Sequence, residues 1–202
     1  MNPKSTHVEQ FVMAYEIEQD RMRALLPEGF RSLRPVLRIN TEIYDEKEVY
    51  VEFNTPVEAK GRRGWLNIAN WSSTRDSLSF AQDEGCVRIT APFLDLSYKG
   101  IGMEGGCPAE KDNEGCYFRK EDHSDLEFRP VETIQSNKEF CDCEFAWKFH
   151  DQDASGKSEG KTIPAYEEKV STSYPKEALT AERAAAIPCK RVLGSYIVRF
   201  ER

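Results

Sequence analysis

The stretch RMRALLPEGFRSLRPVLRINTEIY, Arg21 to Tyr44, predicts a short helix followed by a strand. The helical part is expected to end at Pro27, which lacks a backbone donor, and Gly29 permits a left-handed turn. The extended part alternates Leu37, Ile39 and Ile43 with Arg38, Asn40 and Glu42. One face of this strand should therefore enter the core, and the other should face solvent or line a polar cavity.

The same period of two recurs along much of the chain and favours a mostly β protein. Long strands are expected at Phe11 to Ile17, Val36 to Tyr44, Glu48 to Ala59 and Gly64 to Trp71, and the last three form an antiparallel meander. Further strands are expected at Cys86 to Thr90, Phe93 to Lys99, Tyr117 to Arg119, Leu126 to Ile134, Glu139 to His150, Ile163 to Ser171 and Lys190 to Glu201.

Two short helices and two long loops complete the predicted organisation. Besides the helix in the opening stretch, TAERAAAI is expected to be a helix capped by Thr180 and ended before Pro188. Ile101 to Gly115 is rich in glycine and predicts a loop, and the polar stretch Asp151 to Lys161 predicts a hairpin loop. No shift in composition marks a boundary, so residues 1–202 are expected to form a single domain.

Composition excludes several classes of function. The net charge of −7 without a basic stripe argues against nucleic acid as a partner. No apolar run is long enough to span a membrane and the first ten residues lack the apolar core of a secretory signal, so we expect a cytoplasmic protein. The six cysteines contain no CxxC pair, which favours reduced thiols and no metal site, and no cofactor-binding motif is present.

Polar side chains on the predicted meander are the candidate ligand-binding residues. If the meander is part of a closed or nearly closed barrel, one face of each strand points inward and builds a cavity. The candidate residues are Arg38, Asn40, Glu42, Glu52, Trp65, Asn67 and Asn70. Two alternatives remain open: Arg38 and Glu42 could form an exposed pair, and Trp65 could be an ordinary core residue.

Lys99 is the candidate for covalent chemistry. A lysine that forms a Schiff base must lose its charge, which requires burial or a cationic neighbour. Lys99 ends the apolar strand PFLDLSYK beside the glycine-rich loop. A solvated lysine at a strand end is the alternative interpretation.

Several motifs in the first third of the chain resemble the acetoacetate decarboxylase family. The similar segments are Tyr15 at the end of a strand, LLPEG from Leu25 to Gly29, PVLR from Pro35 to Arg38, VYVE ending in Glu52, and PVEAKGRRGWLNIANW from Pro56 to Trp71. The closing segment IPCKRVLGSYIVRF is similar in kind to the last strand of that family. The resemblance implies a cone-like antiparallel β-barrel with a central cavity.

The resemblance also implies which residues would act. Members that decarboxylate use a lysine in a Tyr/Phe-Pro-Lys setting, and the matching region here lacks that setting, so Lys99 is carried as the stand-in. Glu52 matches the family's carboxylate, whereas Asn40 replaces a second carboxylate and Val8 lies near the position of the family's catalytic arginine. YPKE, Tyr174 to Glu177, contains a Tyr-Pro-Lys sequence, but it lies too far toward the C-terminus to match the family's motif and is expected to begin a helix.

We therefore expect a protein that binds a small keto or carboxylic acid. In a divergent Schiff-base lyase, Lys99 would form the imine, Glu52 would orient or protonate, and Arg38 would hold a carboxylate. In a non-catalytic binder, Arg38 and Glu52 would hold the ligand alone. A protein-interaction module is a third class, and the oligomeric state is left open.

Overall fold

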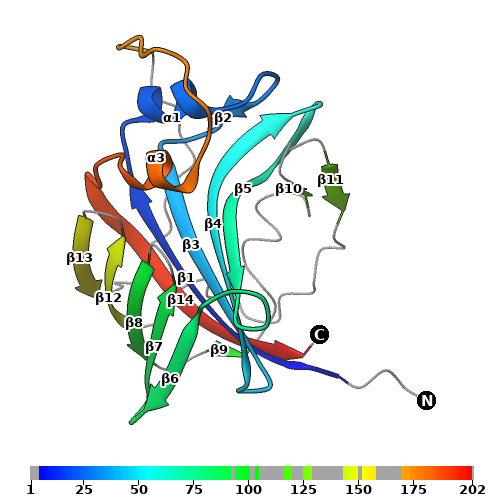
Figure 1. Cartoon of the computed structure of the whole chain (residues 1–202), viewed down its shortest axis with the longest axis vertical. Helices are drawn as coiled ribbons and strands as arrows, with labels where there is room; N and C mark the ends of the chain where they lie inside the picture. Colours follow the sequence, from blue (N-terminus) through cyan, green and yellow to red (C-terminus); the bar gives the residue numbers. More distant parts are fainter. Residues whose placement is uncertain are drawn as a thin grey trace.

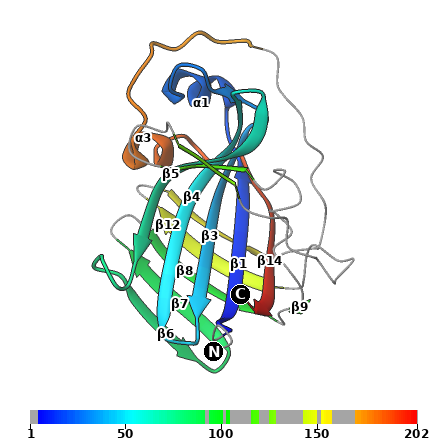
Figure 2. The same ribbon diagram turned by 90° about the vertical axis from the view of Figure 1, so that its right-hand side faces the viewer.

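The computed structural model describes residues 5–91, 94–100, 103–104, 116–119, 125–128, 143–149, 152–157 and 170–201. The strands in these ranges form two sheets of nine and five strands (Figure 1). Figure 2 shows the larger sheet in front of the smaller one, with the two helices at one end. The prediction of a mostly β protein with antiparallel strands and two short helices is confirmed.

The larger sheet has the order β11-β10-β5-β4-β3-β1-β14-β9, and β2 pairs with β4. All of its described pairs are antiparallel except β10 with β5 and β14 with β9. Its strands are β1 (His7–Glu16), β2 (Arg31–Ser32), β3 (Val36–Tyr44), β4 (Glu48–Ala59), β5 (Arg62–Ser72), β9 (Met103–Glu104), β10 (Cys116–Arg119), β11 (Asp125–Phe128) and β14 (Arg191–Glu201).

The smaller sheet has the order β13-β12-β8-β7-β6, and its described pairs are antiparallel. Its strands are β6 (Ser79–Asp83), β7 (Cys86–Ala91), β8 (Leu94–Gly100), β12 (Cys143–Phe149) and β13 (Gln152–Lys157). The hydrogen-bonded pairs described for the two sheets do not extend to a closed ring, so closure of the barrel stays a prediction.

The meander β3-β4-β5 forms where the sequence predicts it, because tight turns follow each alternating segment. Lys60 and Gly61 both have positive φ angles, 52° and 71°, in the turn between β4 and β5. Glycine adopts such angles at little cost, and two positive values suit the right-handed twist of a hairpin. Residues on the three strands are therefore held in a defined register.

The core lies between the two sheets. Phe11 of β1 is fully buried and stacks on Tyr98 of β8, with ring centroids 4.2 Å apart and planes 6° from parallel. Around this pair, one face of the larger sheet packs against the apolar face of the smaller one through Met13, Leu37, Ile39, Val51, Phe53, Val87, Ile89 and Leu96. The side chains on the other face of the larger sheet, among them Arg38, Asn40 and Glu52, are outside this core cluster.

The helices within the described ranges are α1 (Gln19–Leu25) and α3 (Ala181–Ala185), which contact each other. As predicted, α3 begins after Thr180, whose hydroxyl accepts a hydrogen bond from the backbone N–H of Arg183. The chain leaves α1 before Pro27 and turns at Gly29, where φ is 83°. This turn returns the chain to β2 and the start of β3.

Two sequence predictions are wrong. Asp151 to Lys161 was expected to be a loop, but Gln152–Lys157 forms β13, because backbone pairing with β12 does not depend on apolar side chains. Tyr174 to Glu177 begins no helix, since α3 starts only at Ala181. The larger parts of Ile101 to Gly115 and of Ile163 to Ser171 lie outside the described residues, as does Leu126 to Ile134 beyond Phe128.

Candidate functional site

Polar side chains gather on the face of the larger sheet that points away from the smaller sheet. The β3-β4 register places Arg38 opposite Asn54 and Asn40 opposite Glu52. The neighbouring strands add Gln10, which lies opposite Glu42, and Asn67, which lies opposite Asn54. We call this surface the polar face and define it by Gln10, Arg38, Asn40, Glu42, Glu52, Asn54, Trp65 and Asn67.

The polar face is buried. The exposed fraction is 3% for Arg38, 2% for Glu52 and 5% for Glu42. Charged side chains are almost never this deeply buried unless they are paired or serve a binding site. The alternative that Arg38 and Glu42 form an exposed pair is therefore wrong. The register places Arg38 and Glu52 on one face, and that they line an enclosed cavity stays a prediction.

Arginines and a tryptophan form one end of the polar face. The guanidinium carbon of Arg38 lies 3.8 Å from the ring centroid of Trp65, and that of Arg34, which precedes β3, lies 5.8 Å from it. Stacking on an indole is favourable for a guanidinium and keeps its N–H groups in the plane, where they can meet a carboxylate. This arrangement can hold an anionic group.

Two carboxylates, each of which accepts several hydrogen bonds, occupy the middle and the other end of the polar face. Glu52 accepts hydrogen bonds from the Tyr50 hydroxyl at 2.8 Å, Asn54 Nδ2 at 3.1 Å and Asn40 Nδ2 at 3.4 Å. Glu42 accepts from Gln10 Nε2 at 3.2 Å and from the Tyr44 hydroxyl. Each carboxylate is thus held in place by neighbours on the same face.

The amide and indole groups of the polar face include five buried atoms that have no hydrogen-bond partner among the described residues. They are Gln10 Oε1, Asn40 Oδ1, Asn54 Oδ1, Trp65 Nε1 and Asn67 Nδ2. Buried polar groups are nearly always partnered, by protein, water or ligand. A concentration of such atoms on one face is what a binding site requires.

The structure does not bring Lys99 to the polar face. Lys99 lies on β8 of the smaller sheet and is exposed, whereas its neighbour Tyr98 points into the core. The other lysines whose side chains are described are also exposed: Lys47, Lys60, Lys176 and Lys190. Within the described ranges, the polar face has no lysine.

Three residues of this region were not identified from the sequence. Asn54 follows Glu52 by two positions, so strand alternation could have found it. Gln10 and Arg34 become neighbours of the site only through the β1-β3 register and the position of the Trp65 ring. No local signal points to either residue.

Within the described ranges, no group of three or more His, Cys, Asp or Glu could hold a metal ion. Cys86 and Cys189 are free thiols, and the other four cysteine side chains lie outside the described ones. Burial, and then the nearby Glu16 carboxylate, raise the pKa of Cys189 above its ordinary value. This thiol is therefore protonated at neutral pH.

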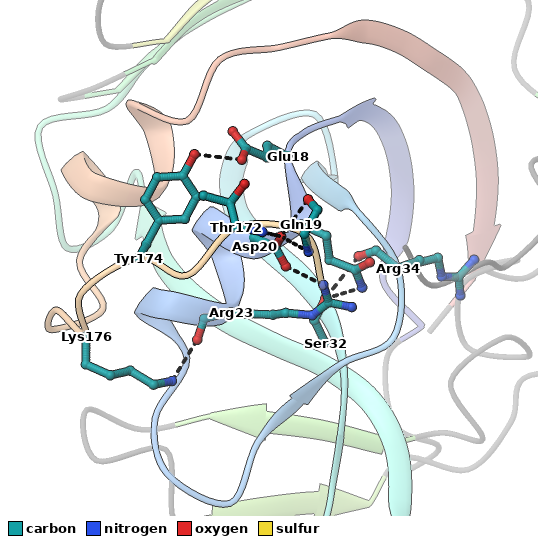
Figure 3. Close-up of polar contacts among 10 residues, drawn as sticks. Glu18, Gln19, Asp20, Arg23, Ser32, Arg34, Thr172, Tyr174 and Lys176 are labelled. Atoms are coloured by element: carbon teal, nitrogen blue, oxygen red, sulfur yellow. Dashed lines mark hydrogen bonds and ion pairs between the residues drawn. The ribbon is translucent and has the colours of Figure 1, made fainter. Parts of the chain in front are cut away.

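A polar segment crosses helix α1 (Figure 3). We call residues 170–177 the strap. Asp20 of α1 accepts hydrogen bonds from the backbone N–H groups of Ser171 at 2.8 Å and Thr172 at 2.7 Å, and it pairs with Arg23 at 2.5 Å. These contacts, the two backbone N–H groups first, hold the pKa of Asp20 well below its usual range.

Further contacts connect the strap and α1 to the arginine end. The Tyr174 hydroxyl donates to Glu18 at 2.7 Å, and Lys176 Nζ donates to the Arg23 carbonyl at 2.7 Å. Gln19, the buried first residue of α1, donates to the Ser32 hydroxyl at 2.9 Å. That hydroxyl in turn donates to the Arg34 carbonyl at 3.2 Å. The backbone of Arg34 is thereby held to α1.

Replacing Asp20 with asparagine is expected to loosen the strap. An amide cannot accept all the hydrogen bonds that the carboxylate accepts, so the amides of Ser171 and Thr172 should exchange with deuterium at least about tenfold faster at neutral pH. Hydrogen-exchange mass spectrometry measures this. Asp83→Asn, an exposed change on β6, should leave exchange in the strap unchanged.

The sign of the pH dependence follows from the lowered pKa of Asp20. The carboxylate stabilises the folded state above its unfolded pKa of about 4, and this contribution is lost as the pH falls through the lower folded pKa. The destabilisation by Asp20→Asn in urea should therefore be largest at neutral pH and shrink below about pH 4. An effect that grew on acidification would contradict this assignment.

Comparisons with solved structures identify the fold. No protein-family model matches the chain, and no curated protein sequence matches it. Among solved structures, an acetoacetate decarboxylase from Legionella pneumophila matches with a TM-score of 0.50 at 12% identity, over 97% of this chain and 83% of that one. The enduracididine biosynthesis enzyme MppR, complexed with the condensation product of pyruvate and imidazole 4-carboxaldehyde, matches with a TM-score of 0.50 at 11% identity, over 100% of this chain and 87% of that one.

The two matches cover nearly the whole chain and agree with the resemblance found in the sequence. The chain thus has an acetoacetate decarboxylase-like fold. No described helix is both long and apolar enough to cross a membrane.

Proposed function

We propose that residues 1–202 form one acetoacetate decarboxylase-like domain that binds a small carboxylic or keto acid in a cavity over the polar face. Arg38, held against Trp65, pairs with the ligand carboxylate, and Asn67 contributes a further donor. Glu52, Asn40 and Glu42 contact the rest of the ligand. The compartment we propose is the cytoplasm.

The observation that carries this proposal is the burial of Arg38 on the same face as donors without a described partner. Arg38 is 3% exposed, and the adjacent Trp65 Nε1 and Asn67 Nδ2 have no partner among the described residues. A planar guanidinium beside two further N–H donors matches a carboxylate, which has two oxygens and accepts bidentate hydrogen bonds.

A second candidate function is a Schiff-base lyase that acts on a keto acid. The fold supports it, because one solved structure with this fold is an acetoacetate decarboxylase and another contains a condensation product of pyruvate. The exposure of Lys99 argues against that residue as the amine, since burial is one of the two ways in which a lysine becomes neutral and nucleophilic and Lys99 lacks it. We therefore favour the binder.

Borohydride trapping separates the two functions. An imine forms when a lysine amine attacks the keto carbon and water leaves, and borohydride reduces the C=N bond to a stable amine. Incubation with acetoacetate and borohydride is expected to give no stoichiometric adduct by mass spectrometry. A stoichiometric adduct on one lysine would establish the lyase, and its loss in Lys99→Ala would identify Lys99 as the amine.

A further inference from the structure

Carboxylates determine the orientation of three amides on the polar face. A carboxylate only accepts hydrogen bonds, so Asn40 and Asn54 must turn their NH₂ groups to Glu52, and Gln10 must turn its NH₂ group to Glu42. The carbonyl oxygens of these three amides therefore point elsewhere. All three carbonyl oxygens are buried and have no hydrogen-bond partner among the described residues.

A similar chain of contacts determines the orientation of Asn67. Arg75 is always a donor, and its Nη2 donates to Asn70 Oδ1 at 2.7 Å. Asn70 must then use its Nδ2 to donate to Asn67 Oδ1, at 3.2 Å. The Nδ2 of Asn67 is left as a donor, as is the indole Nε1 of Trp65.

Donors and acceptors are thus separated along the strands. The donors lie at the end formed by Trp65 and Asn67, beside Arg38. The acceptors follow in three successive rows, Asn54 opposite Arg38, Asn40 opposite Glu52, and Gln10 opposite Glu42. Rows on one face of a strand are about 7 Å apart, so a molecule as short as pyruvate would reach only the first row or two.

We propose that the ligand is a carboxylic acid whose carbon chain, several atoms long, carries hydroxyl groups. This inference rests on the proposed function and specifies its ligand class. The carboxylate lies at Arg38, Trp65 and Asn67. The chain runs along β3, and its hydroxyl groups donate to the carbonyl oxygens of Asn54, Asn40 and Gln10.

Two acids of equal charge and chain length test the role of the hydroxyl groups. Gluconate is a six-carbon acid with a hydroxyl on each carbon except the carboxylate carbon, and hexanoate is the six-carbon acid without hydroxyl groups. In calorimetric titrations, gluconate is expected to bind at least about tenfold more tightly, because hexanoate leaves the buried carbonyl oxygens without donors. Equal or tighter binding of hexanoate would overturn this inference.

Two variants separate the two ends of the site. Gln10→Ala removes the acceptor farthest from the arginine while Glu42 keeps its contact with Tyr44, and it should reduce the preference for gluconate without weakening hexanoate. Trp65→Phe removes the indole donor and should weaken both acids by a similar factor. Gln82→Ala, at an exposed glutamine on β6, is the matched control and should change neither.

The remaining outcomes distinguish this inference from the proposed function. Tighter binding of 6-aminohexanoate, which carries an ammonium group, than of gluconate would show that the assignment of hydroxyl donors is wrong. The proposed carboxylate site at Arg38 would still be supported. If gluconate, hexanoate and acetoacetate all failed to bind, the proposed function itself would fail. Thermal melts of each variant establish that the changes in affinity belong to folded protein.

Discussion

Replacing Arg38 with methionine is expected to weaken the binding of hexanoate and acetoacetate by about 100-fold. Methionine keeps much of the aliphatic volume beside Trp65, but it removes the charge that pairs with the carboxylate. Truncating one member of a buried charge pair costs about 2–5 kcal/mol of binding free energy. Isothermal titration calorimetry against both acids measures the change.

The matched control for this prediction is Arg88→Met. Arg88 lies on β7 of the smaller sheet and is exposed, so its loss removes the same charge from the molecule but not from the polar face. Affinity should change by less than about twofold, as expected for a distant and screened charge. Similar losses in the two variants would indicate a general electrostatic effect and would remove Arg38 from the site.

Replacing Phe11 with alanine is expected to lower the free energy of unfolding by about 3–5 kcal/mol. Phe11 is fully buried and stacks on Tyr98, which joins the two sheets. The change removes the buried ring and leaves a cavity that the rigid strands on either side fill only in part. Urea denaturation followed by fluorescence measures the loss.

Phe80→Ala provides the comparison for the core prediction. Phe80 lies on β6 at the edge of the smaller sheet and is only partly buried, so its removal should cost less than the loss of Phe11. If Phe11→Ala cost no more than Phe80→Ala, the contact between the sheets would not be the centre of the core. Neither variant changes the polar face, so ligand affinity should fall only if part of the variant protein is unfolded under the conditions of the titration.

Strand alternation explains what could be predicted from the sequence. The boundaries of β3 and β4 are those expected, since both strands alternate regularly and a charged turn separates them. Alternation also placed Arg38, Asn40 and Glu42 on one face, together with Glu52. Neither β6 nor β13 has an apolar alternation, and backbone pairing with a neighbouring strand is what defines them.

The rest of the site depends on contacts between distant parts of the chain. Gln10 meets Glu42 across 32 positions, and Asp20 meets Ser171 across 151 positions. Neither pairing has a local signature, because it depends on how strands and helices come together. Lys99 illustrates the converse, since its place at the end of an apolar strand does not reveal that its side chain points away from the core.

The most direct test of the ligand site is the indole N–H signal of Trp65 in a ¹⁵N–¹H NMR spectrum. The chain has three tryptophans, and Trp71 lies on the opposite face of β5, in the core between the sheets. Trp65→Phe and Trp71→Phe assign the two signals. Titration with hexanoate is expected to shift the Trp65 signal saturably and to leave the Trp71 signal in place. A Trp65 signal that stayed unchanged while an acid bound elsewhere would contradict a carboxylate site on the polar face.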